Sequence, residues 1–454
     1  MAEGRKSRSK LDLLARLGFV AGIVGLGFAY GVAVGALEIF PYRLLAQAKS
    51  AAVSLIKAQT KRETFVFDLA PAPGVTVAAN GLASNVADRR SPGLTFIVGF
   101  DGEAYGAKLV DAEGSVLHRW TKTFSEVFPE PRHVQYRARD SEVDWHGTWL
   151  FPNGDVLFNL TGGHFPYGGG LVKIDKDSNI LWSLPRNTHH DIAVADDGTI
   201  YVPAHVYLNE SPRGLSARIE RFYDERILKV SPDGTVLDEI PILAAIRDSD
   251  YRGLLSLNYR DDEDISSDRE DLEDVFHVNN IDVLSDALAP RFARFESGDY
   301  LISIRNINTI AVISHRTKKV IWALTGPFVR QHDPDFTSAG TILVYDNRGH
   351  DGPGGRSRLL EIDPATQAIV WSYTGTADRP FYSFSRGKQQ RLPNGNILAI
   401  EWSPGRVFEV TPDGEIVWEY FNRITTARGE PVTGKVGSVT GARRVTADSL
   451  TFLN

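Results

Sequence analysis

The sequence predicts an all-β fold, a six-bladed β-propeller of four-stranded antiparallel blades, preceded by an N-terminal transmembrane helix and a helical stalk. Three observations predict this architecture: a hairpin motif that recurs along the chain, a second kind of hairpin that follows it, and one long apolar segment near the N-terminus. The two hairpins together supply four strands, and four-stranded units repeated about a centre form a propeller. An open sandwich is the alternative, and it does not require the two ends of the chain to meet.

The first hairpin motif begins eight residues before the glycine of a turn. Its copies read "HGTWLFPNGDVLFNL" from 146, "HDIAVADDGTIYVPAH" from 190, "HDPDFTSAGTILVYDN" from 332 and "GKQQRLPNGNILAIEW" from 387, and a longer copy starts at 277. Asn-Gly and Asp-Gly pairs between alternating strands are strong hairpin signals. The five copies therefore predict the two inner strands of five blades.

The second hairpin motif occurs six times and includes "GLVKIDKDSNILWSL" and "RVFEVTPDGEIVWEY". Five of the six copies end near a tryptophan, namely Trp120, Trp182, Trp322, Trp371 and Trp418. Because the first copy has no first hairpin before it, its partner must come from elsewhere in the chain. We expect the C-terminal segment "GARRVTADSLTFL" (441–453) to pair with this first blade and to close a propeller domain that spans 93–454.

The N-terminus predicts a membrane anchor. Residues 1–16 carry five basic side chains, whereas residues 17–40 carry a single charge, Glu38. About 20 apolar residues span a bilayer, and flanking Lys and Arg stay on the cytoplasmic side. We therefore expect a basic cytoplasmic tail (1–16), a single-pass anchor (17–40) in the inner, cytoplasmic membrane, and a propeller on the periplasmic side. A cleaved signal peptide is the alternative, although its apolar region spans only about 7–15 residues.

Residues 41–92 are expected to form a helical stalk and linker. The part from 42 to 66 is rich in Ala, Leu and Lys, which is typical of a helix, and the part from 71 to 93 is rich in turn residues. Between the third and fourth blades, nine of the fifteen residues of 260–274 are acidic. This insertion is either a solvated loop or a cation site built from carboxylate oxygens.

Composition excludes several functions. The chain has no cysteine, so it has no disulfide, no thiolate nucleophile and no cysteine metal site. Its net charge is −7, and basic residues cluster only at the N-terminus, so nucleic acid is not an expected partner.

Histidines concentrate at equivalent positions of the repeat. The first inner strand starts at His146, His190, His277 or His332, and the second inner strand ends near Thr161, His205, Arg305, Asn347 or Trp402. Antiparallel neighbours bring these two positions to the same mouth of the propeller channel. Three interpretations stay open at this point: transfer of an anionic group through a nucleophilic imidazole, a histidine-rich metal site, and a non-catalytic propeller that serves as a binding scaffold.

Several motifs resemble the bacterial arylsulfotransferase family: "HHDI" at 189–192, "FHVNNI" at 276–281, "LISIRN" at 301–306, "QHDPDF" at 331–336 and "QRLPNGNIL" at 390–398. The resemblance implies a six-bladed propeller that moves a sulfuryl group from an aryl sulfate ester to a phenolic acceptor. It implies a ping-pong mechanism through a sulfohistidine, without a nucleotide donor or any other cofactor. The known members are soluble exported enzymes with an extra β-rich domain and a disulfide, so this chain resembles a membrane-anchored branch.

The resemblance also implies roles for individual residues. His332 of "QHDP" would be the nucleophile, and Arg305 of "SIRN" would be the fixed cation. His277 and Asn279 would bind and polarise the sulfate oxygens. His190 would be a further hydrogen-bond donor to those oxygens or a proton carrier. The repeat position alone adds His146, His205 and Asn347 as substrate-binding candidates, and no metal ligand is predicted.

Overall fold

The computed structural model of the chain describes residues 3–37, 40–41, 65–134, 138–162, 168–208, 215, 222–257, 274–348, 355–426 and 430–453. The chain divides into two units, Met1–Glu63 and Thr64–Asn454. Most of the predicted helical part of the stalk and almost all of the acidic insertion at 260–274 lie outside the described residues.

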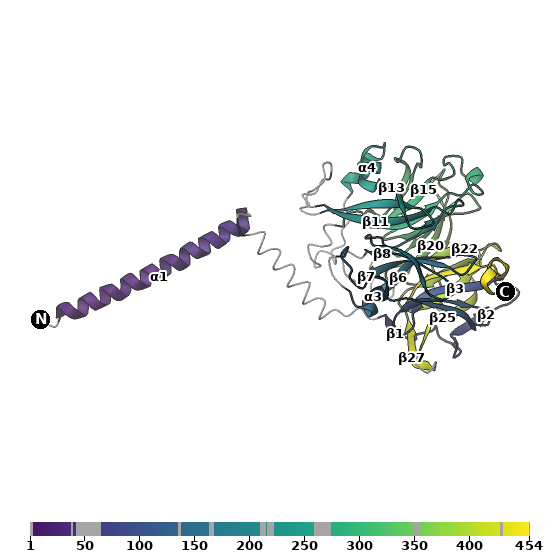
Figure 1. Cartoon of the computed structure of the whole chain (residues 1–454), viewed down its shortest axis with the longest axis horizontal. Helices are drawn as coiled ribbons and strands as arrows, with labels where there is room; N and C mark the ends of the chain where they lie inside the picture. Colours follow the sequence, from purple (N-terminus) through teal and green to yellow (C-terminus); the bar gives the residue numbers. More distant parts are fainter. Residues whose placement is uncertain are drawn as a thin grey trace. The chain divides into compact units, whose positions relative to one another are not determined.

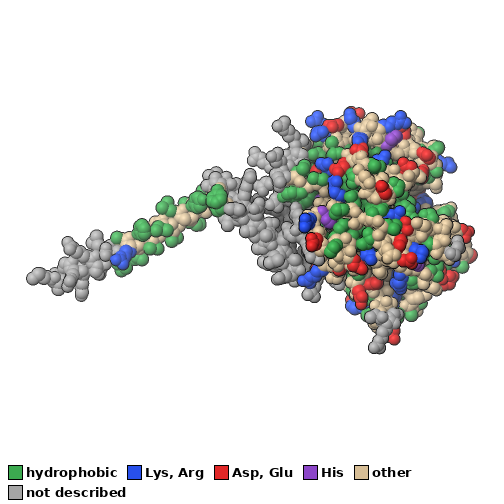
Figure 2. All heavy atoms as spheres, viewed as in Figure 1, with side chains coloured by type: hydrophobic (Ala, Val, Ile, Leu, Met, Phe, Trp, Pro, Cys, Tyr) green, Lys and Arg blue, Asp and Glu red, His purple; other side chains and the backbone are tan. Residues whose placement is uncertain are grey.

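The first unit contains one long helix, α1 (Glu3–Leu37). Its segment Leu13–Val34 is long and apolar enough to cross a membrane, and among the described helices it alone meets that criterion. Hydrophobic side chains cover this part of α1 and are exposed (Figure 2). The helix Glu3–Leu37 thus contains most of the predicted basic tail and of the predicted anchor. Its position and composition fit either an anchor or a signal sequence.

The second unit is mostly β and is built from antiparallel sheets, most of them four-stranded (Figure 1). The first three sheets, each written from its first strand in the hydrogen-bonded order, are β28 (Val439–Val445), β3 (Leu94–Phe100), β4 (Tyr105–Val110) and β5 (Val116–Thr121); β6 (Val143–Leu150), β7 (Val156–Gly162), β8 (Gly168–Ile174) and β9 (Ile180–Leu184); β10 (Ala193–Val194), β11 (Ile200–Leu208), β12 (Phe222–Val230) and β13 (Val236–Pro241).

The next three sheets are β14 (Val278–Val283), β15 (Tyr300–Ile304), β16 (Thr309–Ile313) and β17 (Val320–Thr325); β18 (His332–Phe336), β19 (Ile342–Asp346), β20 (Arg358–Ile362) and β21 (Ile369–Tyr373); β22 (Gln389–Arg391), β23 (Ile397–Glu401), β24 (Arg406–Val410), β25 (Ile416–Phe421) and the added strand β2 (Leu82–Asn85). A smaller sheet joins β1 (Val66–Asp68), β27 (Pro431–Gly437) and β26 (Arg423–Thr425), and the short helices α3 (Phe124–Val127) and α4 (Ile242–Arg247) lie in loops.

The turn glycines of the repeat are required by geometry. Gly340, between β18 and β19, has φ +78°, and a Cβ atom there would lie 2.8 Å from the carbonyl oxygen of Arg291. Only glycine adopts that left-handed turn without steric cost. The turn therefore sets the register in which β18 pairs with β19.

The recurrent tryptophans join each sheet to the next. Each indole Nε1 donates to a backbone carbonyl in a turn of the following sheet: Trp120 to Gly154 (2.9 Å), Trp182 to Pro232 (3.1 Å), Trp322 to Pro364 (3.1 Å), Trp371 to Pro412 (2.9 Å) and Trp418 to Ala112 (3.0 Å). The third sheet lacks the tryptophan, and its Asp238 instead pairs with Lys318 of the fourth. Since Trp418 connects the sixth sheet to the first, these contacts form a closed circle.

The C-terminal strand also joins the first sheet, because β28 pairs with β3 from Val445 opposite Leu94 to Val439 opposite Gly99. The structure differs from the prediction in how this sheet is assembled. Segment 441–453 was expected to supply two strands, but the strand ends at Val445 and two 3₁₀ turns follow. The apolar segment Leu94–Phe100 supplies the second strand instead.

The predicted linker at 71–93 is partly sheet as well. Residues Leu82–Asn85 pair with β25 and extend the sixth sheet by one strand. Their pairing partner lies more than 330 residues away in sequence, so the local richness in turn residues could not reveal it. The β-rich unit therefore begins at Thr64 and not at residue 93.

Candidate functional site

The first strands of the sheets begin with irregular backbone. His190, His277 and Asp333 have φ values of 57°, 50° and 50°. Each such left-handed residue costs roughly 1–2 kcal/mol. Register shifts follow at the start of β14 and β18, and another lies within β6 between Trp145 and Thr148. Strained backbone conformations of this kind cluster at sites where particular side chains must be held in one direction.

Three of the predicted histidines contact one another across three sheets. The ring centroid of His190 lies 4.8 Å from that of His146 and 4.7 Å from that of His277. All three side chains are buried. Burial lowers the pKa of His190 and of His146 well below the usual value. Neighbouring imidazoles lower both further, and the cations Arg386 and Lys388 also lower the pKa of His146. His190 is therefore the centre of a cluster of imidazoles in which it is itself uncharged at neutral pH.

His332 begins β18 and is held in one tautomer. Its Nδ1 lies 2.7 Å from Asn347 Oδ1 and 3.1 Å from the backbone oxygen of Arg330. Both partners accept hydrogen bonds, so Nδ1 carries the proton and Nε2 carries the lone pair. Burial lowers the pKa of His332 well below the ordinary value, and the charge of Arg305 lowers it further. His332 is thus a neutral imidazole with a nucleophilic Nε2.

Asn347 is fully buried, and its amide orientation is fixed. Its Nδ2 donates to the backbone oxygens of Ser383 (2.9 Å) and Arg386 (2.7 Å), which leaves Oδ1 toward His332. Both N–H groups and the oxygen of the amide are therefore engaged within the protein. Asn347 thus contacts His332 through Oδ1; the repeat position predicts it as a substrate-binding group, which stays a prediction.

His277 directly precedes β14 and Arg305 directly follows β15, two strands of the fourth sheet. The backbone N–H of Arg305 donates to the carbonyl of His277 (3.1 Å), and its Nη1 donates to Asn306 Oδ1 (2.8 Å). His277 Nδ1 donates to Asp274 Oδ2, so its Nδ1 is protonated. Burial alone would raise the pKa of Asp274, but His277 and then Arg305 hold it below its usual value. Asp274 is thus an ionised partner for His277.

Asn279 contacts the backbone just before β18, the strand that begins with His332. Its Nδ2 donates to the backbone oxygen of Gln331 (3.0 Å), the residue before His332. This contact uses one donor of the amide that was predicted to bind sulfate oxygens. The role of Asn279 toward the sulfate oxygens stays a prediction.

His205 contacts His189 and Tyr223. Its ring stacks on His189 at 5.0 Å and meets the edge of Tyr223 at 5.2 Å. Sequence reasoning did not select His189 or its partner Glu225. His189 Nδ1 lies 2.8 Å from His190 Nδ1, and its Nε2 lies 3.1 Å from Glu225 Oε2. The doubled histidine of "HHDI" was the one signal in the sequence that pointed to His189.

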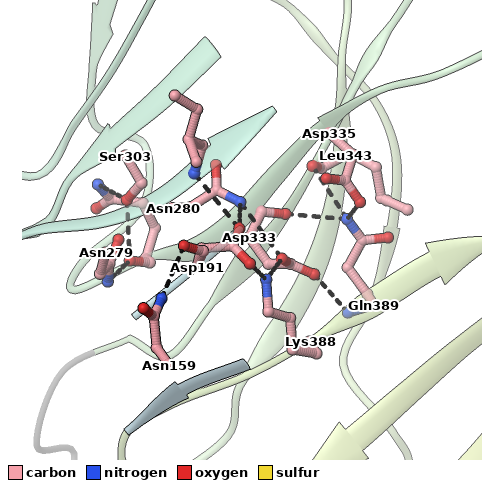
Figure 3. A network of polar contacts seen from close by, with 12 residues as sticks. Asn159, Asp191, Asn279, Asn280, Ser303, Asp333, Asp335, Leu343, Lys388 and Gln389 are labelled. Atoms are coloured by element: carbon pink, nitrogen blue, oxygen red, sulfur yellow. Dashed lines mark hydrogen bonds and ion pairs between the residues drawn. The ribbon is translucent and has the colours of Figure 1, made fainter. Parts of the chain in front are cut away.

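A network of polar contacts is formed by residues that follow His190 and His332 in the chain, together with residues of neighbouring sheets (Figure 3). Lys388 Nζ contacts Asp191 Oδ1 (2.6 Å) and Asp333 Oδ1, while Asn280 Nδ2 donates to Asp191 Oδ2 (2.6 Å) and Gln389 N–H donates to Asp333 Oδ2 (2.7 Å). Asp191 and Asp333 directly follow His190 and His332 in the chain. The network therefore fixes the backbone that carries both histidines and joins the third to the sixth sheet.

A cavity of about 850 Å³ extends from His146 and this network to the tight turns at Ala339 and Gly395. Its lining includes Asp282, and burial raises the pKa of that carboxyl to about 7. The described residues contain no group of three or more histidine or carboxylate side chains placed to hold a metal ion.

The structure thus brings His146, His190 and His277 together and places the charge of Arg305 near His332, as the repeat positions had suggested. It places His205 against His189 and Asn347 against His332. The histidines of two loops, His164 and His350, lie outside the described residues.

Comparisons with known proteins identify the family. Among solved structures, the chain resembles a protein of unknown function from Bacteroides caccae (13% identity, TM-score 0.44, covering 73% of this chain and 94% of that one). It also resembles virginiamycin B lyase from Staphylococcus aureus (12%, 0.39, 83% and 98%) and the WD40 β-propeller domain of Doa1 (12%, 0.39, 82% and 96%). No curated protein matches the sequence. The sequence model of the family described as "Arylsulfotransferase (ASST)" matches residues 148–423, more than half of the chain, and the protein therefore belongs to the arylsulfotransferase family.

Proposed function

We propose that Thr64–Asn454 is a six-bladed β-propeller that transfers a sulfuryl group from an aryl sulfate ester to a phenolic acceptor through sulfo-His332. Family membership supports an arylsulfotransferase activity. The observation that carries the mechanism is the pair of hydrogen bonds to His332 Nδ1, because they leave the lone pair on Nε2. A neutral imidazole with a fixed tautomer is a competent nitrogen nucleophile.

In the first half-reaction, the lone pair of His332 Nε2 attacks the sulfur of the aryl sulfate. The bond between sulfur and the aryl oxygen breaks, and its electron pair leaves with the phenolate, which takes up a proton. The sulfuryl group remains on Nε2. Arg305, whose charge reaches His332, neutralises charge on the sulfuryl oxygens as they pass through the transition state.

In the second half-reaction, the acceptor phenol loses its proton, and its oxygen attacks the same sulfur. The bond between sulfur and Nε2 breaks, and the electron pair returns to the imidazole. His277 and His190 are close enough to each other to contact one bound group together. They hold the sulfuryl oxygens or carry the phenol proton, and His146 extends this surface.

Steady-state transfer from a chromogenic aryl sulfate to phenol tests the proposal. His332→Ala should lower kcat by at least about 1,000-fold, because removing the nucleophile of a covalent route removes the route itself. The matched control is His315→Ala, since His315 is a half-exposed histidine that bonds Asp299 away from the cluster. The proposal fails if His332→Ala retains the activity of the wild type.

We also propose that the protein is a single-pass protein of the inner membrane with its β-rich unit on the periplasmic side; the length and apolar composition of Leu13–Val34 support this. A chain that starts at Thr64 should keep its kcat but lose its association with membranes. Carbonate extraction of cells expressing the two forms measures this difference. Recovery of an N-terminally shortened product of the full-length form in the soluble fraction would instead support cleavage of a signal sequence.

A further inference from the structure

Three buried side chains form a chain of hydrogen bonds that ends at the cluster. Glu225 Oε2 lies 3.1 Å from His189 Nε2, and His189 Nδ1 lies 2.8 Å from His190 Nδ1. The three residues are 3%, 1% and 7% exposed. The rings of His189 and His190 meet edge to face, with their planes 89° apart.

The backbone is distorted at the place where the two rings meet. Consecutive residues of a strand direct their side chains to opposite faces. The left-handed φ of 57° at His190 breaks this alternation. It allows two adjacent imidazoles to share one hydrogen bond, and a strained conformation at this position indicates a function for the contact.

Proton counting allows two states of this chain of groups. A hydrogen bond between two Nδ1 atoms holds a single proton, and a neutral imidazole carries one proton in total. If Glu225 is ionised, His189 Nε2–H donates to it, His190 Nδ1–H donates to His189 Nδ1, and the lone pair of His190 is on Nε2. If Glu225 is protonated, every one of these hydrogen bonds reverses, and His190 Nε2 carries the proton.

We infer that Glu225, His189 and His190 form a proton relay that exchanges one proton with the phenol oxygen through His190 Nε2. This inference rests on the proposed function. The relay begins a cycle loaded, with the proton on His190 Nε2. When the aryl sulfate is cleaved, that proton moves to the leaving phenolate oxygen, His189 passes its Nδ1 proton to His190, and Glu225 becomes a carboxylate.

The acceptor phenol reloads the relay. Its O–H bond breaks as the proton moves to His190 Nε2, the Nδ1 proton of His190 moves to His189, and the Nε2 proton of His189 moves to Glu225. The phenol oxygen attacks the sulfur of sulfo-His332 at the same time. One proton leaves in the first half-reaction and one returns in the second, so the cycle balances without a co-reactant.

The electrostatics of the site fit a relay in which both imidazoles stay neutral. Burial lowers the pKa of His189 to about 4, and burial followed by the influence of His277, His146, His189 and His332 lowers the pKa of His190. Burial raises the pKa of Glu225 well above its usual value, and the ionised Asp274 raises it further, against an opposing effect of His277. The carboxyl therefore holds the proton that the imidazoles do not keep.

Glu225→Gln tests the relay, because it removes the titrating group with little change of shape. Glu225 Oε1 accepts the N–H of Val278 at 3.3 Å, so the glutamine oxygen should occupy that place and its amide should donate to His189. The variant is then fixed in the loaded state and cannot accept a proton. Sulfation of His332 by an aryl sulfate with an acidic leaving group should stay within about 3-fold of the wild type, because such a leaving group needs little acid assistance.

Transfer from the sulfo-enzyme to unsubstituted phenol should fall about 100-fold in Glu225→Gln, the lower range for loss of general acid–base catalysis. Transfer to a nitrophenol that is ionised in solution should be nearly unaffected. The matched control is Asp224→Asn, the neighbouring carboxyl on β12, which pairs with Arg226 instead of a histidine. Equal losses with both acceptors in Glu225→Gln, or no loss with phenol, would overturn the relay.

A second readout does not depend on sulfotransfer. In the ¹⁵N NMR spectrum of histidine-labelled full-length protein, His190 should change from the Nε2–H to the Nδ1–H tautomer as pH rises, and it should remain Nε2–H throughout in Glu225→Gln. A single tautomer at all pH values in the wild type would overturn the relay. Failure of the wild type to take up a sulfuryl group would instead overturn the proposed function, while the NMR titration still decides whether the relay exchanges a proton.

Discussion

Asn347 Oδ1 accepts the Nδ1 proton of His332 across 2.7 Å, and the amide is held in place by the carbonyls of Ser383 and Arg386. This one relationship determines which ring nitrogen of His332 has the lone pair. It connects the fifth sheet, which carries both residues, to the loop before the sixth. The orientation of the proposed nucleophile is therefore set by backbone carbonyls that cannot titrate.

Replacing Asn347 by leucine should show whether its side chain orients His332 or binds the substrate. Without the acceptor, His332 can place its proton on Nε2, so kcat should fall about 100-fold while KM changes little. The carbonyls of Ser383 and Arg386 lose their donor, which should lower the free energy of unfolding by about 1–3 kcal/mol. Steady-state kinetics and urea unfolding measure the two effects.

The control for this variant is Asn396→Leu. Asn396 is also buried, and its amide donates to the Arg89 carbonyl (2.8 Å) and to Glu409 (2.7 Å), away from the histidines. It should show the loss of stability without the loss of kcat. If Asn347→Leu lost only stability, the tautomer argument would be wrong.

Arg305→Gln should change the pH dependence of sulfation. The charge of Arg305 lowers the pKa of His332, and protonated His332 cannot attack sulfur. In the wild type the sulfation rate should therefore stay level as pH falls through about 6.5, the ordinary histidine pKa, and decline only further down. In the variant the decline should begin at higher pH, and kcat/KM should fall about 100- to 1,000-fold.

Single-turnover rates between pH 4.5 and 8 check this expectation. Arg379→Gln, a half-exposed arginine that pairs with Glu419, should leave the profile unchanged. If the sulfation rate of Arg305→Gln declined at the same pH as that of the wild type, Arg305 would not influence the pKa of His332.

Lys388→Met should destabilise the protein. Lys388 neutralises Asp191 and Asp333, and removing one partner from a buried ionic network typically costs about 3–5 kcal/mol. Asp333 can lessen this cost by binding a proton, because burial raises the pKa of its carboxyl. Since it does so more readily at low pH, the loss in unfolding free energy should be smaller at pH 5 than at pH 8.

Urea unfolding of Lys388→Met and of Lys435→Met compares a buried with an exposed ion pair. Lys435 pairs with Asp68, whose side chain is 83% exposed, and its removal should cost no more than about 1 kcal/mol. Equal losses for the two variants would refute a structural role for the network in Figure 3.

Truncation tests the joining of the chain ends. Removing 439–454 deletes β28 and leaves β3 without its inner partner, so cooperative thermal unfolding should disappear. Removing 447–454 spares β28 and deletes only the 3₁₀ turns, whose Leu450 is buried. This shorter deletion should lower Tm without abolishing cooperative unfolding. A cooperative transition at the wild-type Tm in the longer deletion would show that the fold does not need closure.

Much of the fold could be predicted because it is local. Glycine turns and alternating strands are encoded within about fifteen residues, and the six second hairpins with their tryptophans indicate how many sheets to expect. The repeat could not indicate that Leu94–Phe100 and Leu82–Asn85 are strands, because both depend on partners at the opposite end of the chain. The charge pattern of the N-terminus did not indicate that one helix, Glu3–Leu37, contains most of the basic tail and of the apolar segment.

The repeat indicates which strand positions the candidate side chains occupy. It does not indicate which partner each of those side chains contacts. Equivalent strand starts indicated His146, His190, His277 and His332 because a repeat brings equivalent positions together. Which atom each side chain contacts depends on backbone distortion, as at His190, and on residues far apart in sequence, as with Glu225 and His189. Asn347 shows the same limit: its place at the end of a strand was predictable, but the two carbonyls that its amide donates to were not.

The measurement that tests the account most directly is the intact mass of the protein after brief exposure to a chromogenic aryl sulfate without acceptor, followed by peptide mapping. The account predicts a gain of one sulfuryl group, located on His332, that disappears when phenol is added and never forms in His332→Ala. An unchanged mass while aryl sulfate is being turned over, or a sulfuryl group on another residue, would contradict it.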